Sequence, residues 1–345
     1  MRTEYIKIGS DSEKNAQTFL RAGEIIRSGG LVAFPTETVY GLGGNALDAD
    51  AARKIYAAKG RPSDNPLIIH IAKIEDADKY CLTNPMYFRL AEKFLPGPLT
   101  VILPKRDCIP DTVTGGLDTV AVRLPSDPNA RKLIEAAGVP IAAPSANRSG
   151  KPSPTTAKHV LDDMDGRIEM IIDGGPCEIG LESTIVKITD DCLTILRPGG
   201  VTAEMLSEVC PVKLDKVITE KLADGERPLA PGMKYRHYAP DTKVVLVDST
   251  REQFIDFVRE QAKNGKIGSL VSNSDEKLLH DSGAVLLTLG DGDATEAHEL
   301  FAKLREVDGC GCTVFYARLP EKSGIGLAVY NRFIKAAGYD VLKLV

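Results

Sequence analysis

The stretch 50-DAARKIYAAKGRPSDNPLIIHI-71 contains both kinds of element from which the fold is predicted. Asp50 is the expected N-cap of a helix, and Gly60 is the expected residue just past its end, where glycine tolerates a left-handed backbone. A polar turn bracketed by prolines follows, and the apolar run 67–71 is typical of a buried strand. A helix followed at once by a core strand favours an α/β protein.

The same alternation continues through residues 1–209, which we predict to be one domain. Tight turns rich in Gly and Pro separate its elements, so the sheet should be mixed and twisted rather than purely parallel. The further strands expected here are 31–34, 99–103, 119–124 and 184–188, and the further helices are 14–28, 85–95 and 127–137.

Residues 241–345 have a more regular pattern and predict a smaller, doubly wound, Rossmann-like α/β domain. No glycine occurs in its first strand-to-helix turn, 247–254, so nothing marks that turn as a nucleotide site. The expected strands are 243–247, 267–271, 284–289 and 313–317, and the expected helices are 250–263, 294–307 and 324–337.

Residues 210–240 are predicted to connect the two domains, because they have no apolar period and several prolines. The cluster Tyr235-Arg236-His237-Tyr238 is unusual for a passive spacer. Two interpretations stay open at this point. The segment is either a tether or a lid that covers a bound ligand.

Composition sets limits on function. The net charge of −5 argues against a protein that coats nucleic acid, although it does not exclude a local cationic pocket. Seven scattered cysteines without a CxxC pair argue against a disulfide framework or a zinc site, and Cys310-Gly-Cys312 is either a reactive dithiol or two residues at a strand entry. Without a long apolar run or a signal-peptide pattern, we expect an unprocessed cytoplasmic protein with no membrane association.

One motif is misleading. The run 41-GLGGNA-46 matches a dinucleotide-binding pattern, but it does not follow a predicted strand. Lys59 to Arg61 also stand where such a fold needs an acidic residue. We therefore reject a dinucleotide site, and the absence of P-loop and hydrolase motifs rejects those classes as well.

The turn that ends the predicted helix 50–59 carries two cations. Lys59 alone is explained by the helix dipole, which favours a cation in the last turn. Arg61 lies beyond the helix end and has no such explanation. Two cations on a turn stiffened by Pro62 suit a phosphate group, with Lys as a point charge and Arg as a fork.

Other polar residues interrupt apolar stretches. His70 is either a hydrogen-bonded core histidine or part of a pocket. The loop 143–156 is either a plain polar turn or a set of ligand contacts at a strand end. Arg123 and Arg197 lie in apolar runs, and a buried arginine needs an anion, which can be a protein carboxylate or a ligand.

Seven blocks, taken in order along the chain, resemble the YrdC-like threonylcarbamoyl-AMP synthase family in its long, two-domain form. None of them departs from the family pattern. The blocks are FPTETVYGLG (34–43), AAKGRPSDNPLIIHI (57–71), TVAVRLP (119–125), APSANRSGKPSPT (143–155), GLESTIV (180–186), LRPG (196–199) and APGMKYRHYAP (230–240).

The resemblance implies an enzyme that condenses L-threonine, bicarbonate and ATP into threonylcarbamoyl-adenylate and pyrophosphate. A separate tRNA threonylcarbamoyl transferase would then modify the adenosine beside the anticodon of ANN-decoding tRNAs. The implied ATP-site residues are Lys59, Arg61, Asn65, Thr119, Ser145, Asn147, Ser153, Arg197 and Tyr238. The implied threonine-site residues are Thr38, His70, Arg123, Ala143 and Ser183.

This chemistry agrees with the residues. Adenylate formation builds negative charge on phosphate oxygens, which Lys59, Arg61 and Mg²⁺ would stabilise, although the sequence does not identify ligands for the metal. The attacking group is a carboxylate of the substrate itself, so no nucleophilic side chain is required. Two other classes of protein stay open. One is an RNA-binding module, although the acidic net charge argues against it and predicts that tRNA binding is weak or indirect. The other is a carbamoyltransferase-type domain that uses carbamoyl-phosphate.

Overall fold

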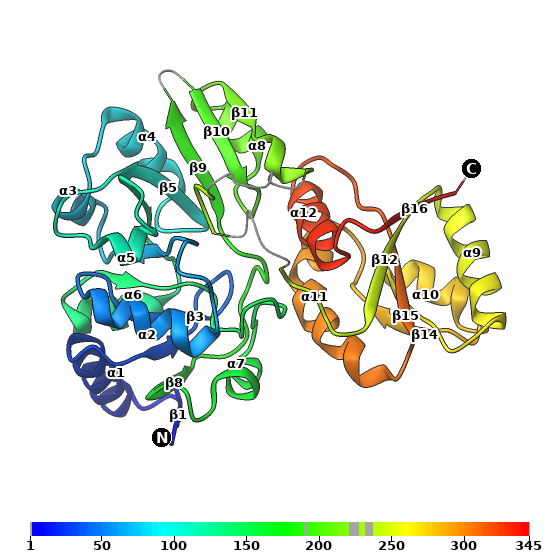
Figure 1. Ribbon diagram of the computed structural model, residues 1–345, viewed down its shortest axis with the longest axis horizontal. Coiled ribbons are helices and arrows are strands. Elements are labelled where there is room, and N and C mark those ends of the chain that lie inside the picture. Colours follow the sequence, from blue (N-terminus) through cyan, green and yellow to red (C-terminus); the bar gives the residue numbers. More distant parts are fainter. Residues whose placement is uncertain (1, 190–191, 221–227, 232–236, 345) are drawn as a thin grey trace. The chain divides into compact units, whose positions relative to one another are not determined.

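The computed structural model describes residues 2–189, 192–220, 228–231 and 237–344, which form two compact units (Figure 1). The first unit comprises Met1–Ser149, Ser153–Glu178 and Glu182–Lys234. The second comprises Gly150–Pro152, Ile179–Leu181 and Tyr235–Val345. Among the described residues, none of the helices has the length and apolar character needed to cross a membrane.

The first unit is built on an eleven-stranded mixed sheet, as predicted. Parallel and antiparallel neighbours alternate irregularly: β4 is parallel to β6, for example, whereas β7 is antiparallel to β4. In sheet order the strands are β1 (Glu4–Lys7), β8 (Met170–Asp173), β2 (Val32–Phe34), β3 (Gly41–Asn45), β7 (Ile141–Ala142), β4 (Ile68–His70), β6 (Thr119–Arg123), β5 (Leu99–Pro104), β9 (Thr184–Thr189), β10 (Cys192–Arg197) and β11 (Val212–Leu214).

Several helices of the first unit pack apolar residues against this sheet. The neighbouring helices α1 and α6, for example, close a core cluster in which Phe19, Ala22, Leu133 and Ile134 pack over β2 and β8. The helices are α1 (Ser12–Arg27), α2 (Ala49–Lys59), α3 (Ala77–Tyr80), α4 (Pro85–Phe94), α5 (Asp111–Thr114), α6 (Pro128–Ala137), α7 (Ala157–Met164) and α8 (Ala203–Ser207).

The N-cap of helix α2 lies two residues before its predicted position. Asp48, not Asp50, is the cap, and its side chain accepts a hydrogen bond from the backbone N–H of Asp50. Both residues are aspartates, so residue type alone did not separate them. The predicted end of the helix is confirmed, because Gly60 has a φ of 64° in the left-handed region.

The run 41–46, rejected above as a dinucleotide motif, contains the buried strand β3. A Cβ atom on Gly43 would lie 2.8 Å from a methyl group of Ile141 and 2.9 Å from the ring of Phe34. This glycine is therefore required by close packing between strands and not by the approach of a phosphate.

The first unit continues past residue 209, where the predicted domain boundary lies. Strand β11 pairs with β10, and Val217 and Ala230 are buried in a cluster with Ile68 and Ile102 of the sheet. A three-residue strand and isolated apolar residues give no periodic signal, so the sequence did not reveal them. Residues 221–227 and 232–236, which include Tyr235 and Arg236 of the predicted lid, lie outside the described residues.

The second unit has a five-stranded parallel sheet, in agreement with the predicted α/β class. Figure 1 shows α9 and α10 on one face of this sheet and α11 and α12 on the other. Counted within the unit, the strand order is 3-2-4-1-5, whereas a dinucleotide-binding sheet begins 3-2-1-4. The elements are β12 (Lys243–Asp248), α9 (Arg251–Lys263), β13 (Gly268–Val271), α10 (Asn273–Leu279), β14 (Val285–Thr288), α11 (Asp293–Glu306), β15 (Val314–Arg318), α12 (Gly326–Ala336) and β16 (Val341–Lys343).

Candidate active site

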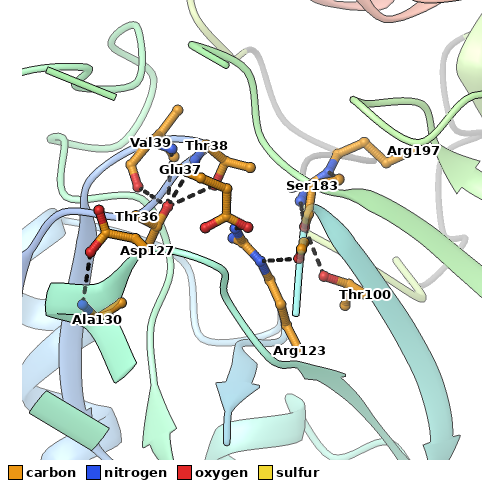
Figure 2. Close-up of polar contacts among 11 residues, drawn as sticks. Thr36, Glu37, Thr38, Val39, Thr100, Arg123, Asp127, Ala130, Ser183 and Arg197 are labelled. Carbon is orange, nitrogen blue, oxygen red and sulfur yellow. Dashed lines mark hydrogen bonds and ion pairs between the residues drawn. The ribbon is translucent and has the colours of Figure 1, made fainter. Parts of the chain in front are cut away.

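A tight turn after β2 positions the first site residues. The hydroxyl of Thr36 accepts hydrogen bonds from the backbone N–H groups of Thr38 and Val39, each at 3.2 Å. It also lies 2.8 Å from the Thr38 hydroxyl and 2.7 Å from the carbonyl oxygen of Val39. These contacts fix Glu37 and Thr38, both buried, in one orientation (Figure 2).

The centre of the site is a buried ion pair. Nη2 of Arg123, at the end of β6, lies 2.6 Å from Oε1 of Glu37, and both side chains are about 5% exposed. This approach lacks hydrogen-bond geometry, and neither carboxylate oxygen accepts a hydrogen bond from any described residue. The anion that Arg123 was predicted to need is therefore, within the protein, the carboxylate of Glu37, which sequence analysis missed.

His70 lies beside this pair. The register of β4 and β6 places it opposite Arg123, and its Nδ1 is 3.3 Å from the carbonyl oxygen of Ile141. Burial, reinforced by the positive charge of Arg123, lowers the pKa of His70 to about 3. The imidazole is therefore neutral at physiological pH and adds no charge to the site.

A second carboxylate, Asp127, lies near the pair and caps a helix. Its Oδ1 accepts hydrogen bonds from the backbone N–H groups of Asn129 and Ala130, at 2.8 and 2.9 Å, and so caps α6. Burial raises the pKa of Asp127 above its ordinary value, although these two hydrogen bonds and the charge of Arg123 act in the opposite direction. Figure 2 shows its carboxylate directed at the helix and not at Arg123.

Ser183 and Arg197 form the opposite side of the site. The Ser183 hydroxyl lies 2.7 Å from that of Thr100 and accepts a hydrogen bond of 3.2 Å from Nη2 of Arg197. Nε of Arg197 donates to the Ser183 carbonyl at 3.0 Å. All three side chains are buried, so the polar groups of this wall are held by one another.

Lys59 is buried at the end of α2, and its ammonium group holds the loop after β7. Nζ donates to the carbonyl oxygens of Ser145 at 2.6 Å and Asn147 at 2.5 Å. The Ser145 hydroxyl donates to Oδ1 of Asn147 at 2.6 Å. The loop predicted to bind a ligand and the predicted phosphate-binding lysine are therefore one hydrogen-bonded unit.

Arg61 lies on the turn that leads into β4 and is half-buried. Its Nη2 donates to the carbonyl oxygens of Asn65 and Pro66, at 3.2 and 3.0 Å. The side chain of Asn65 is 1% exposed, and no described residue donates a hydrogen bond to its Oδ1. The turn thus combines a cation with a buried amide oxygen that a bound molecule could use.

Strand register separates the predicted residues into two groups. Ile68 pairs with Ala121 and His70 with Arg123, so the turn 61–66 and Thr119 lie at the amino ends of β4 and β6. Arg123 follows Thr119 by four residues, or about 13 Å along a strand. Strand β7 is antiparallel to β4, so the loop that leaves β7 runs from the His70 end of β4 towards Lys59. Ala143 lies on this path, and its N–H donates to the carbonyl oxygen of Ile68.

Two predicted ATP-site residues, Ser153 and Tyr238, lie outside the two groups just described. Ser153 is fully buried and donates to Oε1 of Glu182 at 2.6 Å, a second carboxylate that sequence analysis missed. Tyr238 belongs to the second unit, where its ring lies 5.0 Å from that of Phe301 and 5.9 Å from the guanidinium of Arg332. It is therefore not part of the group of side chains that the first unit brings together.

Known proteins resemble this chain along nearly its whole length. A family model described as telomere recombination matches residues 24–199, and one described as the C-terminal domain of threonylcarbamoyl-AMP synthase matches residues 201–338. The threonylcarbamoyl-AMP synthase of Pyrococcus abyssi is 47% identical over 94% of this chain and 95% of its own length. That of Bacillus subtilis is 43% identical over 98% of each chain.

A solved structure agrees with these relatives. The crystal structure of P. abyssi Sua5 complexed with L-threonine superposes with a TM-score of 0.90 at 44% identity, and the match covers 100% of both chains. Together the matches define an enzyme of the nucleotidyltransferase type. The chain belongs to the threonylcarbamoyl-AMP synthase family, which confirms the resemblance that the seven sequence blocks indicated.

Proposed function

We propose that this protein forms threonylcarbamoyl-adenylate and pyrophosphate from L-threonine, bicarbonate and ATP. The observation that carries the proposal is the arrangement of two polar groups at opposite ends of β4 and β6, joined by the loop after β7. One group suits an amino acid and the other suits phosphates. The reaction needs both within reach of a single bound intermediate.

The carboxyl ends of β4 and β6 would bind threonine. Arg123 would bind its carboxylate, and the neutral His70 and the hydroxyls of Thr38 and Ser183 would contact its polar atoms. Ala143 adds a small apolar wall next to Ile68. All five of these residues are less than 5% exposed, so polar contacts with a substrate would be largely desolvated and correspondingly strong.

The turn and the loop at the other end would bind ATP. Arg61 would contact phosphate oxygens, and Lys59 would contribute its charge while it holds the loop that carries Ser145 and Asn147. Negative charge grows on the phosphate oxygens as the carboxylate of N-carboxy-threonine attacks the α-phosphorus and pyrophosphate leaves. Fixed positive charge in a partly buried site lowers the barrier of such a step. In this proposal Asn65, Thr119, Ser153 and Arg197 complete the ATP site. A role of Tyr238 in binding ATP stays a prediction.

A resident metal site does not fit the described residues. They contain no group of three or more His, Cys, Asp and Glu side chains that could hold a metal ion. The predicted Mg²⁺ would then arrive on the phosphates of ATP as part of the substrate.

The product would pass to a tRNA threonylcarbamoyl transferase, with which we expect a transient contact. With a net charge of −5, direct binding of tRNA by this chain should be weak. The cytoplasmic location and the lid role of residues 210–240 stay predictions.

The test is pyrophosphate release from ATP by the full chain, with L-threonine and bicarbonate supplied together or one at a time. Release should require both, and ¹³C from labelled bicarbonate should appear in the adenylate. Equal turnover when either is omitted would contradict the proposal. Tight, salt-dependent binding of tRNA without ATP turnover would favour the RNA-binding alternative.

A further inference from the structure

The Glu37–Arg123 pair is incompletely satisfied for two buried charges. A buried ion pair is stable when hydrogen bonds satisfy the remaining donors and acceptors. Here both oxygens of Glu37 and Nη2 of Arg123 make no hydrogen bond with any described residue, although the Arg123 Nη2 and Glu37 Oε1 atoms are 2.6 Å apart. Buried polar groups left in this state call for a functional explanation.

The neighbouring residues do not supply the missing hydrogen bonds. Asp127 uses its carboxylate to cap α6, and the hydroxyl of Thr36 is occupied by its own turn. His70 has its pKa lowered to about 3, so it is a neutral ring and not a cationic partner for Glu37. The two oxygens of Glu37 are therefore buried acceptors in contact with Arg123 that no described residue satisfies.

A carboxylate in contact with a guanidinium has the charge pattern that complements an α-amino acid. The ammonium and carboxylate of such a molecule are attached to one carbon, so both can meet the pair at once. Arginine alone would accept any carboxylate. We propose that Glu37 binds the ammonium of the amino-acid substrate and takes a proton from it when the amine is carboxylated. This inference rests on the proposed function.

The proton step is balanced. The ammonium gives one proton to the Glu37 carboxylate, and the resulting amine attacks the carbon of bicarbonate. A C–N bond forms, a C–O bond breaks, and N-carboxy-threonine and water are produced. Glu37 later returns its proton to solvent.

The test compares L-threonine with 2,3-dihydroxybutanoate of the same configuration, in which a hydroxyl replaces the ammonium. Equilibrium binding of each is measured with the wild type, Glu37→Gln and a control, Glu4→Gln, whose carboxylate pairs with Arg21 at the surface. The wild type and the control should prefer the amino acid by about 10- to 100-fold, the range expected for hydrogen bonds to charged groups. Glu37→Gln should bind both molecules alike.

A purely structural role for Glu37 would weaken both ligands equally, so an unchanged preference in Glu37→Gln would overturn the proposal. Turnover of Glu37→Gln at saturating threonine should also fall by about 100-fold or more. A rate within threefold of the wild type would overturn the proton-transfer role.

If Glu37→Gln does not fold, Glu37→Asp keeps the charge and withdraws it by one methylene group. That variant should lose at least about threefold of the preference, which is a modest part of the hydrogen-bond range. An unchanged preference would again overturn the proposal. Failure of the wild type to bind threonine or turn over ATP would instead count against the proposed function.

Discussion

Two charged regions of the first unit hold their cations in different ways. Lys59 and Arg61 donate to backbone carbonyl oxygens of Ser145, Asn147, Asn65 and Pro66. Arg123 instead lies against the carboxylate of Glu37. Both arrangements occupy the cations, and that of Arg123 involves an opposite full charge.

The difference predicts what each region binds. Carbonyl oxygens are neutral, so these hydrogen bonds fix the positions of Lys59 and Arg61 without themselves cancelling positive charge, which suits an anion such as phosphate. The Glu37–Arg123 pair is neutral as a whole and directional, so it favours a zwitterion. The first unit can thus distinguish its two substrates by the way in which it holds the cations of each region.

The largest effect should come from breaking the buried pair on one side. Arg123→Met leaves the Glu37 carboxylate buried without its partner, which should lower the free energy of unfolding by about 3 to 5 kcal/mol. Adding Glu37→Gln removes the uncompensated charge and should recover most of that loss. Urea unfolding of the two single variants and the double variant gives the coupling energy, and additive effects would mean that the pair is not coupled.

Removing a cation held by carbonyl oxygens should affect catalysis more than stability. Arg61→Ala should lower kcat/KM by the equivalent of about 2 to 4 kcal/mol of transition-state stabilisation while the protein stays folded, because its charge acts on phosphate. Arg53→Ala is the matched control, since Arg53 is an exposed cation on the same region of chain, paired with Asp50. Unchanged turnover, or unfolding of the Arg61 variant, would contradict the phosphate role.

The neutrality of His70 can be tested through the pH dependence of stability. Its pKa is about 3 in the folded protein and about 6.5 when unfolded, so between these values the unfolded state binds more protons. Its contribution is fully present above pH 6.5 and is lost as the pH falls, by about 2 kcal/mol at pH 5. Unfolding curves of His70→Gln should have a shallower slope over this range, and an unchanged slope would mean that His70 is charged beside Arg123.

The smallest effect should come from an exposed ion pair. Lys158 and Asp162 are one helical turn apart on α7, and their side chains are 78% and 52% exposed. Lys158→Ala should change stability by no more than about 0.5 kcal/mol, because solvent screens the pair. A loss as large as that of Arg123→Met in the same urea experiment would show that burial does not explain the difference between the pairs.

Local signals in the sequence predicted much of the fold and part of the site. Helix α2, the turn at Gly60 and strand β4 were predicted because capping, turn chemistry and an apolar run agree within one stretch. Strand β11 and the burial of Ala230 were missed, because both depend on contacts with residues far away in the sequence. Glu37 was missed for the same reason.

The sequence by itself determined that Arg123 and His70 lie in apolar strands and that Lys59 and Arg61 share a turn, because these are properties of neighbouring residues. It required an anion for Arg123 without identifying one. Only the tertiary structure decided that Glu37, more than eighty residues earlier, is that anion, and that carbonyl oxygens hold Lys59 and Arg61. The physical reason is that charge compensation in a protein interior acts over a few ångströms of space, and strand register rather than sequence position decides which groups come that close.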